Sequence, residues 1–129
     1  MIKVVKENVV EFKKSDDEKQ IVYGEVYVPE QRDTDGNWMT AATIEKMAHD
    51  FMENLRNTHI DKNHDGKTDK GTVVESFIVR KGDPDYTEGA WVVGVHVPDK
   101  TIWGQVKKGE LTGFSIGGEA QLVEEEEDE

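Results

Sequence analysis

Apolar and polar residues alternate over short stretches along most of the chain, which is the pattern of β-strands that bury one face. These stretches are rich in Val, Ile and aromatic residues and end at Pro, Gly or charged clusters. They predict strands at Ile2–Phe12, Ile21–Val28, Gly71–Arg80, Ala90–Val97 and Leu111–Val123, with a short extended segment around His59–His64. The polar run Lys13–Gln20 is expected to break the chain between the first two strands.

One segment has the period of a helix instead. From Thr40 to about Asn57, apolar residues recur at the spacing of a single helix face, at Ile44, Met47, Ala48, Phe51, Met52 and Leu55. Thr40 can cap this helix, because its side-chain oxygen can accept a hydrogen bond from a backbone N–H of the first turn. A shorter helix is predicted from Asp99 to Lys108, with Asp99 as its cap and Gly109 at its end.

Together these elements predict a fold of the α+β class. We expect a mostly antiparallel β-barrel or strongly curved sheet with one main helix and a short second helix. The domain is expected to cover residues 1–123. Residues Glu124–Glu129 are all acidic and are expected to form a disordered tail, because such a segment has no apolar surface to bury.

Composition removes several classes of function. The chain has 129 residues, no Cys and a formal net charge of −12. The length suits one domain, and the absence of Cys excludes disulfides, thiolate nucleophiles and Cys-ligated metal sites. Excess carboxylates repel phosphate groups, so neither a nucleic-acid nor a membrane partner is expected. The N-terminal residues hold no continuous apolar run, so we expect no signal peptide or transmembrane helix and a cytoplasmic protein.

A loop in the middle of the chain resembles a metal site. The segment Asp61–Asp69 (DKNHDGKTD) has Asp or Asn at its first, third and fifth positions and Gly at the sixth, like the opening of an EF-hand loop. The rest does not match, because Thr72 stands where a bidentate Glu should complete the calcium shell. A polar turn between strands is therefore favoured over a metal site, and no cofactor is expected.

Ser115 is the candidate nucleophile. It lies between glycines in the sequence GFSIG, whereas Ser15 lies in a charged run and Ser76 in an apolar strand. Flanking glycines leave a hydroxyl accessible and let backbone N–H groups approach a substrate. The same G-x-S-x-G pattern forms the nucleophile elbow of α/β-hydrolases, where the catalytic His follows the Ser. All four His residues here precede Ser115, which excludes that fold.

A Ser nucleophile requires a base, and His64 is the favoured candidate. It lies beside Asp65 in a polar loop, where a neutral imidazole can accept a proton, although a solvated loop histidine fits the pattern equally well. His49 lies on the helix flank, His59 in the loop after the helix, and His96 at the end of a strand. These three are expected to be structural or exposed.

The residues around His64 and Ser115 resemble the phage prohead serine proteases, which are distantly similar to herpesvirus assemblin. The resemblance is strongest to the branch found in Bacillus-type tailed phages and prophages. It covers most of the chain in ordered blocks: VYGEVYVPEQRDTDGNWMT, IDKNHDGK, VVESFIVRKGDPDY, GAWVVGVHVPD and KKGELTGFSIGG. The length and order of these blocks make the family assignment more specific than either short motif.

This resemblance implies an antiparallel β-barrel flanked by helices, and a serine endopeptidase that cleaves phage scaffold and major capsid proteins during prohead maturation. It implies Ser115 as nucleophile and His64 as general base. Backbone N–H groups near Ile116 and Gly117 would stabilise the oxyanion. The implied location is the host cytoplasm, within the procapsid, and homo-oligomerisation is left open.

The third catalytic residue is ranked by its position after the nucleophile, as in the related viral enzymes. Glu119 comes first, although a fully extended strand would put it about 13 Å from Ser115 at about 3.3 Å per residue. Asp65 and Glu75 are alternatives, as are a bare dyad and a third residue in a missing C-terminal piece. A non-catalytic capsid-assembly or scaffold module of the same fold is the rival function, and a calcium-binding module at Asp61–Asp69 is a weaker one.

Overall fold

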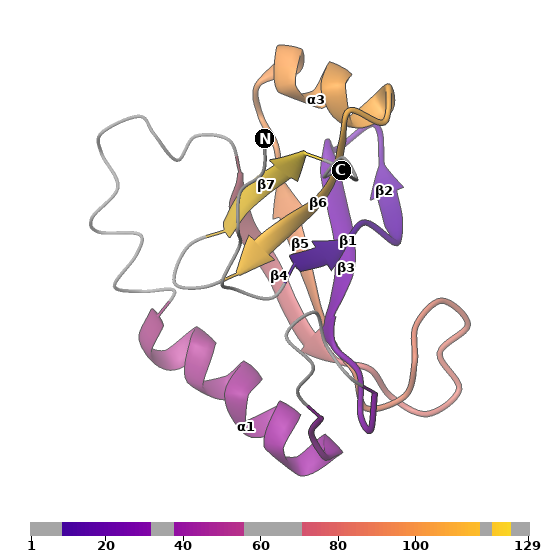
Figure 1. Cartoon of the computed structure of the whole chain (residues 1–129), viewed down its shortest axis with the longest axis vertical. Coiled ribbons are helices and arrows are strands. Elements are labelled where there is room, and N and C mark those ends of the chain that lie inside the picture. The colour runs from indigo at the N-terminus through magenta and orange to yellow at the C-terminus, as the bar shows by residue number, and fades with distance from the viewer. Residues whose placement is uncertain (1–8, 32–37, 56–70, 117–119, 125–129) are drawn as a thin grey trace, which may run out of the picture.

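The computed structural model describes residues 9–31, 38–55, 71–116 and 120–124 (Figure 1). Its strands are β1 (Val9–Glu11), β2 (Lys14–Asp16), β3 (Ile21–Tyr27), β4 (Thr72–Ile78), β5 (Trp91–His96), β6 (Leu111–Ile116) and β7 (Ala120–Glu124). Its helices are α1 (Ala41–Asp50), which continues into the π-helical turn η1 (Phe51–Leu55), and α3 (Lys100–Lys107). Every described strand pair is antiparallel, so the predicted α+β class is confirmed.

The strands form two sheets, with the orders β1-β6-β7 and β2-β3-β5-β4. The chain passes from one to the other at Phe12 and Lys13. The Phe12 N–H donates to the Thr112 carbonyl of β6 (3.0 Å), and the Lys13 N–H donates to the Tyr23 carbonyl of β3 (2.7 Å). Figure 1 shows the β6-β7 hairpin lying across one face of the larger sheet. The described strands do not close into a barrel, so the predicted barrel is not confirmed.

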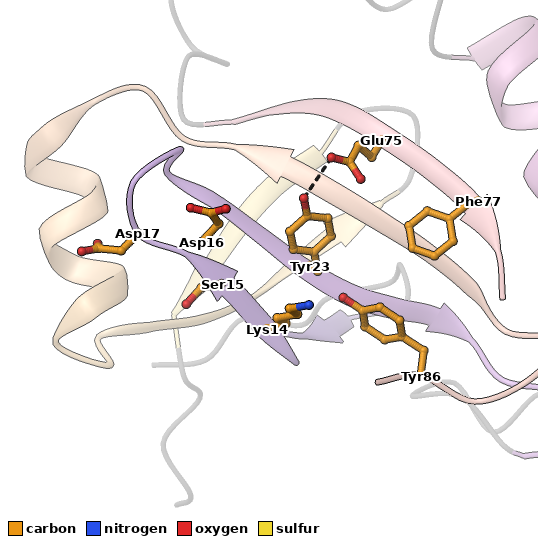
Figure 2. Close-up of a pocket in the computed structure, with 8 residues that line it drawn as sticks. All are labelled: Lys14, Ser15, Asp16, Asp17, Tyr23, Glu75, Phe77 and Tyr86. Atoms are coloured by element: carbon orange, nitrogen blue, oxygen red, sulfur yellow. Dashed lines mark hydrogen bonds between the residues drawn. The ribbon is translucent and has the colours of Figure 1, made fainter. Parts of the chain in front are cut away.

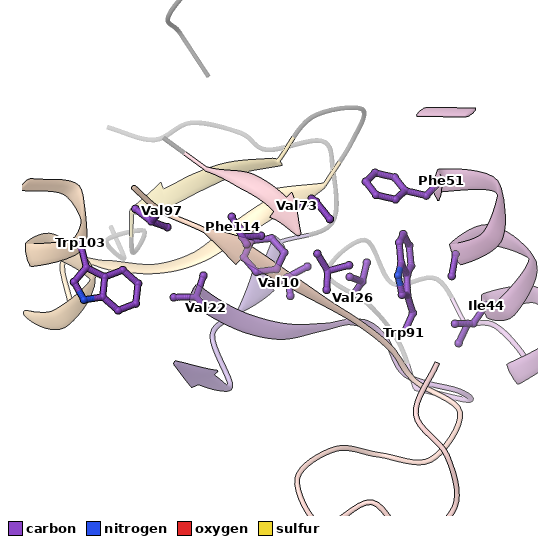
Figure 3. Packing of buried hydrophobic residues seen from close by; sticks show 13 residues of the cluster. Val10, Val22, Val26, Ile44, Phe51, Val73, Trp91, Val97, Trp103 and Phe114 are labelled. Atoms are coloured by element: carbon purple, nitrogen blue, oxygen red, sulfur yellow. The ribbon is translucent and has the colours of Figure 1, made fainter. Parts of the chain in front are cut away.

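The main core lies on the face of the larger sheet that β1, β6 and α1 cover (Figure 3). Strand β5 supplies its centre through Trp91, Val93 and Val95. A smaller cluster of Val79, Ala90 and Val92 lies on the opposite face, beneath the 80–89 loop. Because β5 is buried on both faces, its sequence WVVGVH is almost continuously apolar and lacks the alternation of a half-buried strand.

The main helix has the predicted cap and the predicted apolar stripe. The Thr43 N–H donates to the Thr40 hydroxyl, and Ile44, Ala48 and Phe51 are buried. The ring of Phe51 packs on Trp91 of β5 with the centroids 5.5 Å apart. The indole N–H of Trp91 in turn donates to the Ser76 hydroxyl over 3.0 Å. Ser76 is therefore a satisfied core hydroxyl, as expected from its apolar strand.

The short helix α3 is held by the turn between β2 and β3. Asp99 caps it, as predicted, by accepting from the Ile102 N–H. The buried Trp103 donates its indole N–H to Asp17 over 2.7 Å, and this hydrogen bond, helped by the Lys107 charge, lowers the pKa of Asp17. Neither this helix nor α1 is long and apolar enough to cross a membrane, within the part of the chain that the structure describes.

Two predicted strand assignments were wrong. Residues 14–16 form an edge strand inside the run predicted to be a break, because polar side chains are compatible with an exposed sheet edge. The predicted single strand Leu111–Val123 is two strands, β6 and β7, with Ile116 paired to Ala120. The sequence between them contains Gly117 and Gly118, which favour a turn. Strand β7 reaches Glu124, where the acidic tail was predicted to begin, and residues 125–129 lie outside the described part.

At Gly24 of β3 the two sheets lie close together. A Cβ built at Gly24 would lie 2.5 Å from Val10 Cγ1 and 2.7 Å from the Glu11 carbonyl oxygen. The second of these atoms belongs to the backbone of β1 and cannot rotate away. Only a residue without a side chain allows β1 to lie this close to β3.

Gly24→Ala should therefore destabilise the fold by about 1–3 kcal/mol, measured by urea unfolding, because the added methyl group has no space between β3 and β1. Gly104→Ala is the matched control. It lies in α3 with nothing within 4 Å of the added Cβ, and there alanine should raise stability because it is the better helix former. A neutral effect at Gly24 would contradict the close packing of the two sheets.

Candidate active site

Ser115 lies in β6, the central strand of the smaller sheet. It is paired with Val9 of β1 on one side and Gln121 of β7 on the other. A central strand is held by hydrogen bonds on both edges, so its backbone has little freedom. The candidate nucleophile is thus carried by a fixed strand and not by a long loop. Ile116, a candidate oxyanion residue, ends the same strand.

The residues just before Ser115 anchor this strand in the core. Phe114 is fully buried, and its ring lies 6.2 Å from that of Phe12 between centroids. At Gly113 an added Cβ would lie 2.6 Å from the Val10 carbonyl oxygen. The glycine was predicted to leave the serine accessible, and the structure gives it a packing role, since it lets the backbones of β1 and β6 come together.

The other predicted catalytic residues lie outside the described residues. These are His64, the general base; Glu119, the first-ranked third residue; and Gly117, the second oxyanion residue. Asp65 and the whole Asp61–Asp69 loop lie outside them as well. The distance argument against Glu119 assumed one extended strand from Ser115 onward. Because β6 and β7 are separate antiparallel strands, that assumption was wrong.

Glu75 was an alternative orienting acid, and the structure shows which residues its side chain contacts and which sheet face it occupies. It lies on β4 opposite Gly94 of β5, and its carboxylate accepts the Tyr23 hydroxyl hydrogen over 2.9 Å. This face of the larger sheet is the one turned away from β6, as the pale β6-β7 hairpin behind the sheet in Figure 2 shows. The sheet itself therefore separates Glu75 from the strand that carries Ser115.

The described histidines fit the structural roles expected for them. His49 is exposed on α1 and lies 3.8 Å from Glu45, one helical turn earlier. His96 is half-buried at the end of β5, paired with Ile21 and Thr72. It shares the sheet face of Gly94, because side chains alternate along a strand, and so it also faces away from β6.

Sequence reasoning missed a shallow polar depression on that outer face, with a volume of about 490 Å³. It lies over the row in which Lys14, Tyr23, Gly94 and Glu75 are paired across four strands. The sequence did not indicate this depression, because β2 was not predicted and Tyr23 and Glu75 are far apart in the chain. Burial, with a smaller effect of the Glu75 hydrogen bond, raises the pKa of Tyr23 to about 12.

This pKa predicts a loss of stability at high pH. Tyr23 titrates near 10 when unfolded and at about 12 when folded. A raised folded pKa means that its stabilising contribution is complete below pH 10 and is lost as pH rises through about 12. Absorbance titration of the phenolates should show this late ionisation, and Tyr23→Phe should remove it. A wild-type curve in which every tyrosine ionises near pH 10 would contradict the raised pKa of Tyr23.

Among the described residues, no group of three or more His, Asp or Glu side chains is arranged to hold a metal ion.

Two of three comparisons with known proteins found matches. The family described as "Putative phage serine protease XkdF" matches residues 8–124. The chain is 41% identical over 118 residues to "Phage-like element PBSX protein XkdF" and 42% identical over 118 residues to "Uncharacterized protein YqbD", both of Bacillus subtilis (strain 168). Each match covers 88% of this chain but only 42% of the first relative and 36% of the second. No solved structure matches the chain.

Proposed function

The chain belongs to the phage XkdF family, whose description is that of a serine protease, and on that premise we propose that it is the protease portion of a phage serine endopeptidase. Its proposed substrates are the scaffold and major capsid proteins of the same phage, cleaved during prohead maturation. The proposed place of action is the procapsid in the host cytoplasm. The chain spans less than half the length of the relatives it matches, so these substrates belong to the proposal for the whole protein.

One observation carries the proposal: the family match from residue 8 to residue 124 includes the whole segment from His64 to Ser115. Two features of the fold support it. Ser115 is on the central strand of a small sheet, and the buried side chain of Phe114 fixes that strand in the core. A nucleophile carried by a strand that is paired on both edges has a defined backbone position, which favours the alignment that acyl transfer requires.

The proposed chemistry is acyl transfer in two steps. His64 accepts the hydroxyl proton of Ser115 as its oxygen attacks a peptide carbonyl carbon, and the C–N bond then breaks as His64 returns the proton to the leaving amine. Backbone N–H groups near Ile116 and Gly117 stabilise the oxyanion. Water, deprotonated by His64, then attacks the acyl carbonyl carbon, and the ester C–O bond breaks as His64 returns this proton to the Ser115 oxygen. Glu119 or Asp65 is proposed to orient the imidazole.

Labelling with a fluorophosphonate tests this proposal directly. The reagent phosphonylates only serines that a base activates, so mass spectrometry should find it on Ser115 and not on Ser15 or Ser76. His64→Ala should prevent the labelling. Folded protein that stays unlabelled at Ser115 would favour the rival function, a non-catalytic capsid-assembly module.

A further inference from the structure

The outer face of the larger sheet carries a depression that the proposed protease chemistry does not use. Its walls come from β2, β3, β4 and the 80–89 loop (Figure 2). Gly94 lies at the centre of the face, and the Tyr23 ring covers it, since an added Cβ there would lie 2.8 Å from Tyr23 Cε2. The face carries aromatic rings that remain partly open to solvent.

Three aromatic side chains surround the depression. Tyr23, Phe77 and Tyr86 each line it and are each half-buried. The rings of Phe77 and Tyr86 make an edge contact with centroids 6.0 Å apart, so they support one another. Asp83 folds the loop under Tyr86 by accepting from the backbone N–H groups of Asp85 and Tyr86. The aromatic walls are therefore fixed in place before any ligand arrives.

The charge around these rings is negative. Asp16, Asp17 and Glu75 line the depression together with one cation, Lys14, and Asp17 is already paired with Lys107 of α3. Lys14 is bound to Asp85 over 3.1 Å, and that contact raises its pKa, so its charge is already matched. In the described part of the chain, no ion pair brings a Lys or Arg to Glu75. The Tyr23 hydroxyl occupies one oxygen of Glu75, Oε2, and a carboxylate can accept further hydrogen bonds.

We propose that this depression binds the cationic side chain of a partner peptide, an arginine in particular, between Glu75 and the rings of Tyr23, Phe77 and Tyr86. A guanidinium can stack on an aromatic ring and at the same time donate to a carboxylate. Lysine fits less well, because its ammonium is more strongly hydrated and cannot stack. An anionic or purely apolar ligand would leave the Glu75 charge uncompensated.

The site lies on the sheet face opposite β6, so it would hold a partner without touching the strand of Ser115. It is a docking site in addition to the proposed catalytic centre. The inference does not depend on the proposed function, because a non-catalytic assembly module could use the same site. Loss of labelling at Ser115 and loss of arginine binding are therefore separate results.

Nuclear magnetic resonance titration of the ¹⁵N-labelled chain tests the proposal. The probe is an acetylated, amidated Gly-Gly-Arg-Gly-Gly peptide, and the control is the same peptide with citrulline, which is neutral and nearly isosteric. The arginine peptide should shift the amide signals of Tyr23, Glu75, Phe77 and Tyr86 and saturate with a Kd on the order of 1 mM. The citrulline peptide should bind about tenfold more weakly, because it lacks the charge-assisted hydrogen bond.

Two variants test whether arginine binding requires the charge of Glu75. Glu75→Gln keeps an acceptor for the Tyr23 hydroxyl but removes the charge, so it should weaken arginine binding about tenfold with an unchanged fold. Glu110→Gln removes an exposed carboxylate at the end of α3 and should change nothing. Equal shifts with both peptides, or no saturation up to about 10 mM, would overturn the proposal. Shifts of the same residues on protein concentration alone would overturn it too, since they would make a second copy of the chain the occupant.

Discussion

Ser115→Ala in the full-length protein should abolish proteolysis while leaving the domain folded. Removing the nucleophile of a serine protease lowers the rate by about four to six orders of magnitude. The remaining cleavage would be too slow to detect on a gel. The measurement is processing of the phage scaffold and major capsid proteins when they are expressed together with the variant. The free energy of unfolding should change by less than about 1 kcal/mol, because the substitution removes a single hydroxyl.

Two controls keep this result interpretable. Thr101→Ala removes an exposed hydroxyl of α3, outside both the candidate catalytic site and the depression, and this variant should cleave like the wild type. His64→Ala should lose as much activity as Ser115→Ala, and the double variant should lose no more, since members of one catalytic unit are not additive. Normal processing by Ser115→Ala would contradict the proposed protease function and favour the non-catalytic assembly module.

The same experiment can rank the third residue. Glu119→Gln and Asp65→Asn each remove one carboxylate that is proposed to orient His64. In a serine protease triad, loss of the acid lowers the rate by about 10⁴-fold, because the imidazole is then held in the wrong tautomer. One variant should show this loss and the other should not. Full activity in both would favour a bare dyad.

The local elements were readable from the sequence where one physical signal dominated. The apolar stripe of α1 and the caps at Thr40 and Asp99 were predicted correctly, because each depends on residues within one or two turns. The same holds for β3, β4 and β5. Each of these strands begins and ends within two residues of the β-branched and aromatic run from which it was predicted.

What the sequence did not reveal depends on contacts between distant segments. The edge strand β2 exists because it pairs with β3 and because its turn receives Trp103 from α3, a partner 86 residues away. The division of residues 111–123 into β6 and β7 was missed because an apolar run does not show where it folds back. The glycines of GFSIG were interpreted as space for a substrate, whereas Gly113 makes space for β1.

Phe114→Ala should cost about 3–5 kcal/mol of folding free energy, a large part of the about 5–15 kcal/mol that a domain of this kind has. Phe114 is fully buried, and it lies between Phe12, which it contacts ring to ring, and the close crossing at Gly24. Alanine would leave a cavity there, because the backbones of β1 and β3 are already in contact and cannot move in to fill it. Urea unfolding measures the loss.

Hydrogen exchange can distinguish a local effect of this cavity from destabilisation of the whole domain. Phe114 is the buried anchor of β6, so hydrogen exchange at the β6 amides should accelerate more than at β5, whose own core residues are intact. Phe114→Leu keeps most of the buried volume and should cost about 1 kcal/mol or slightly more. If alanine loosens β5 as much as β6, the two sheets unfold as one unit. If exchange accelerates only in β6 and β7, the strand that carries Ser115 depends on Phe114 for its position. Fluorophosphonate labelling of Ser115 should then fall in Phe114→Ala and survive in Phe114→Leu.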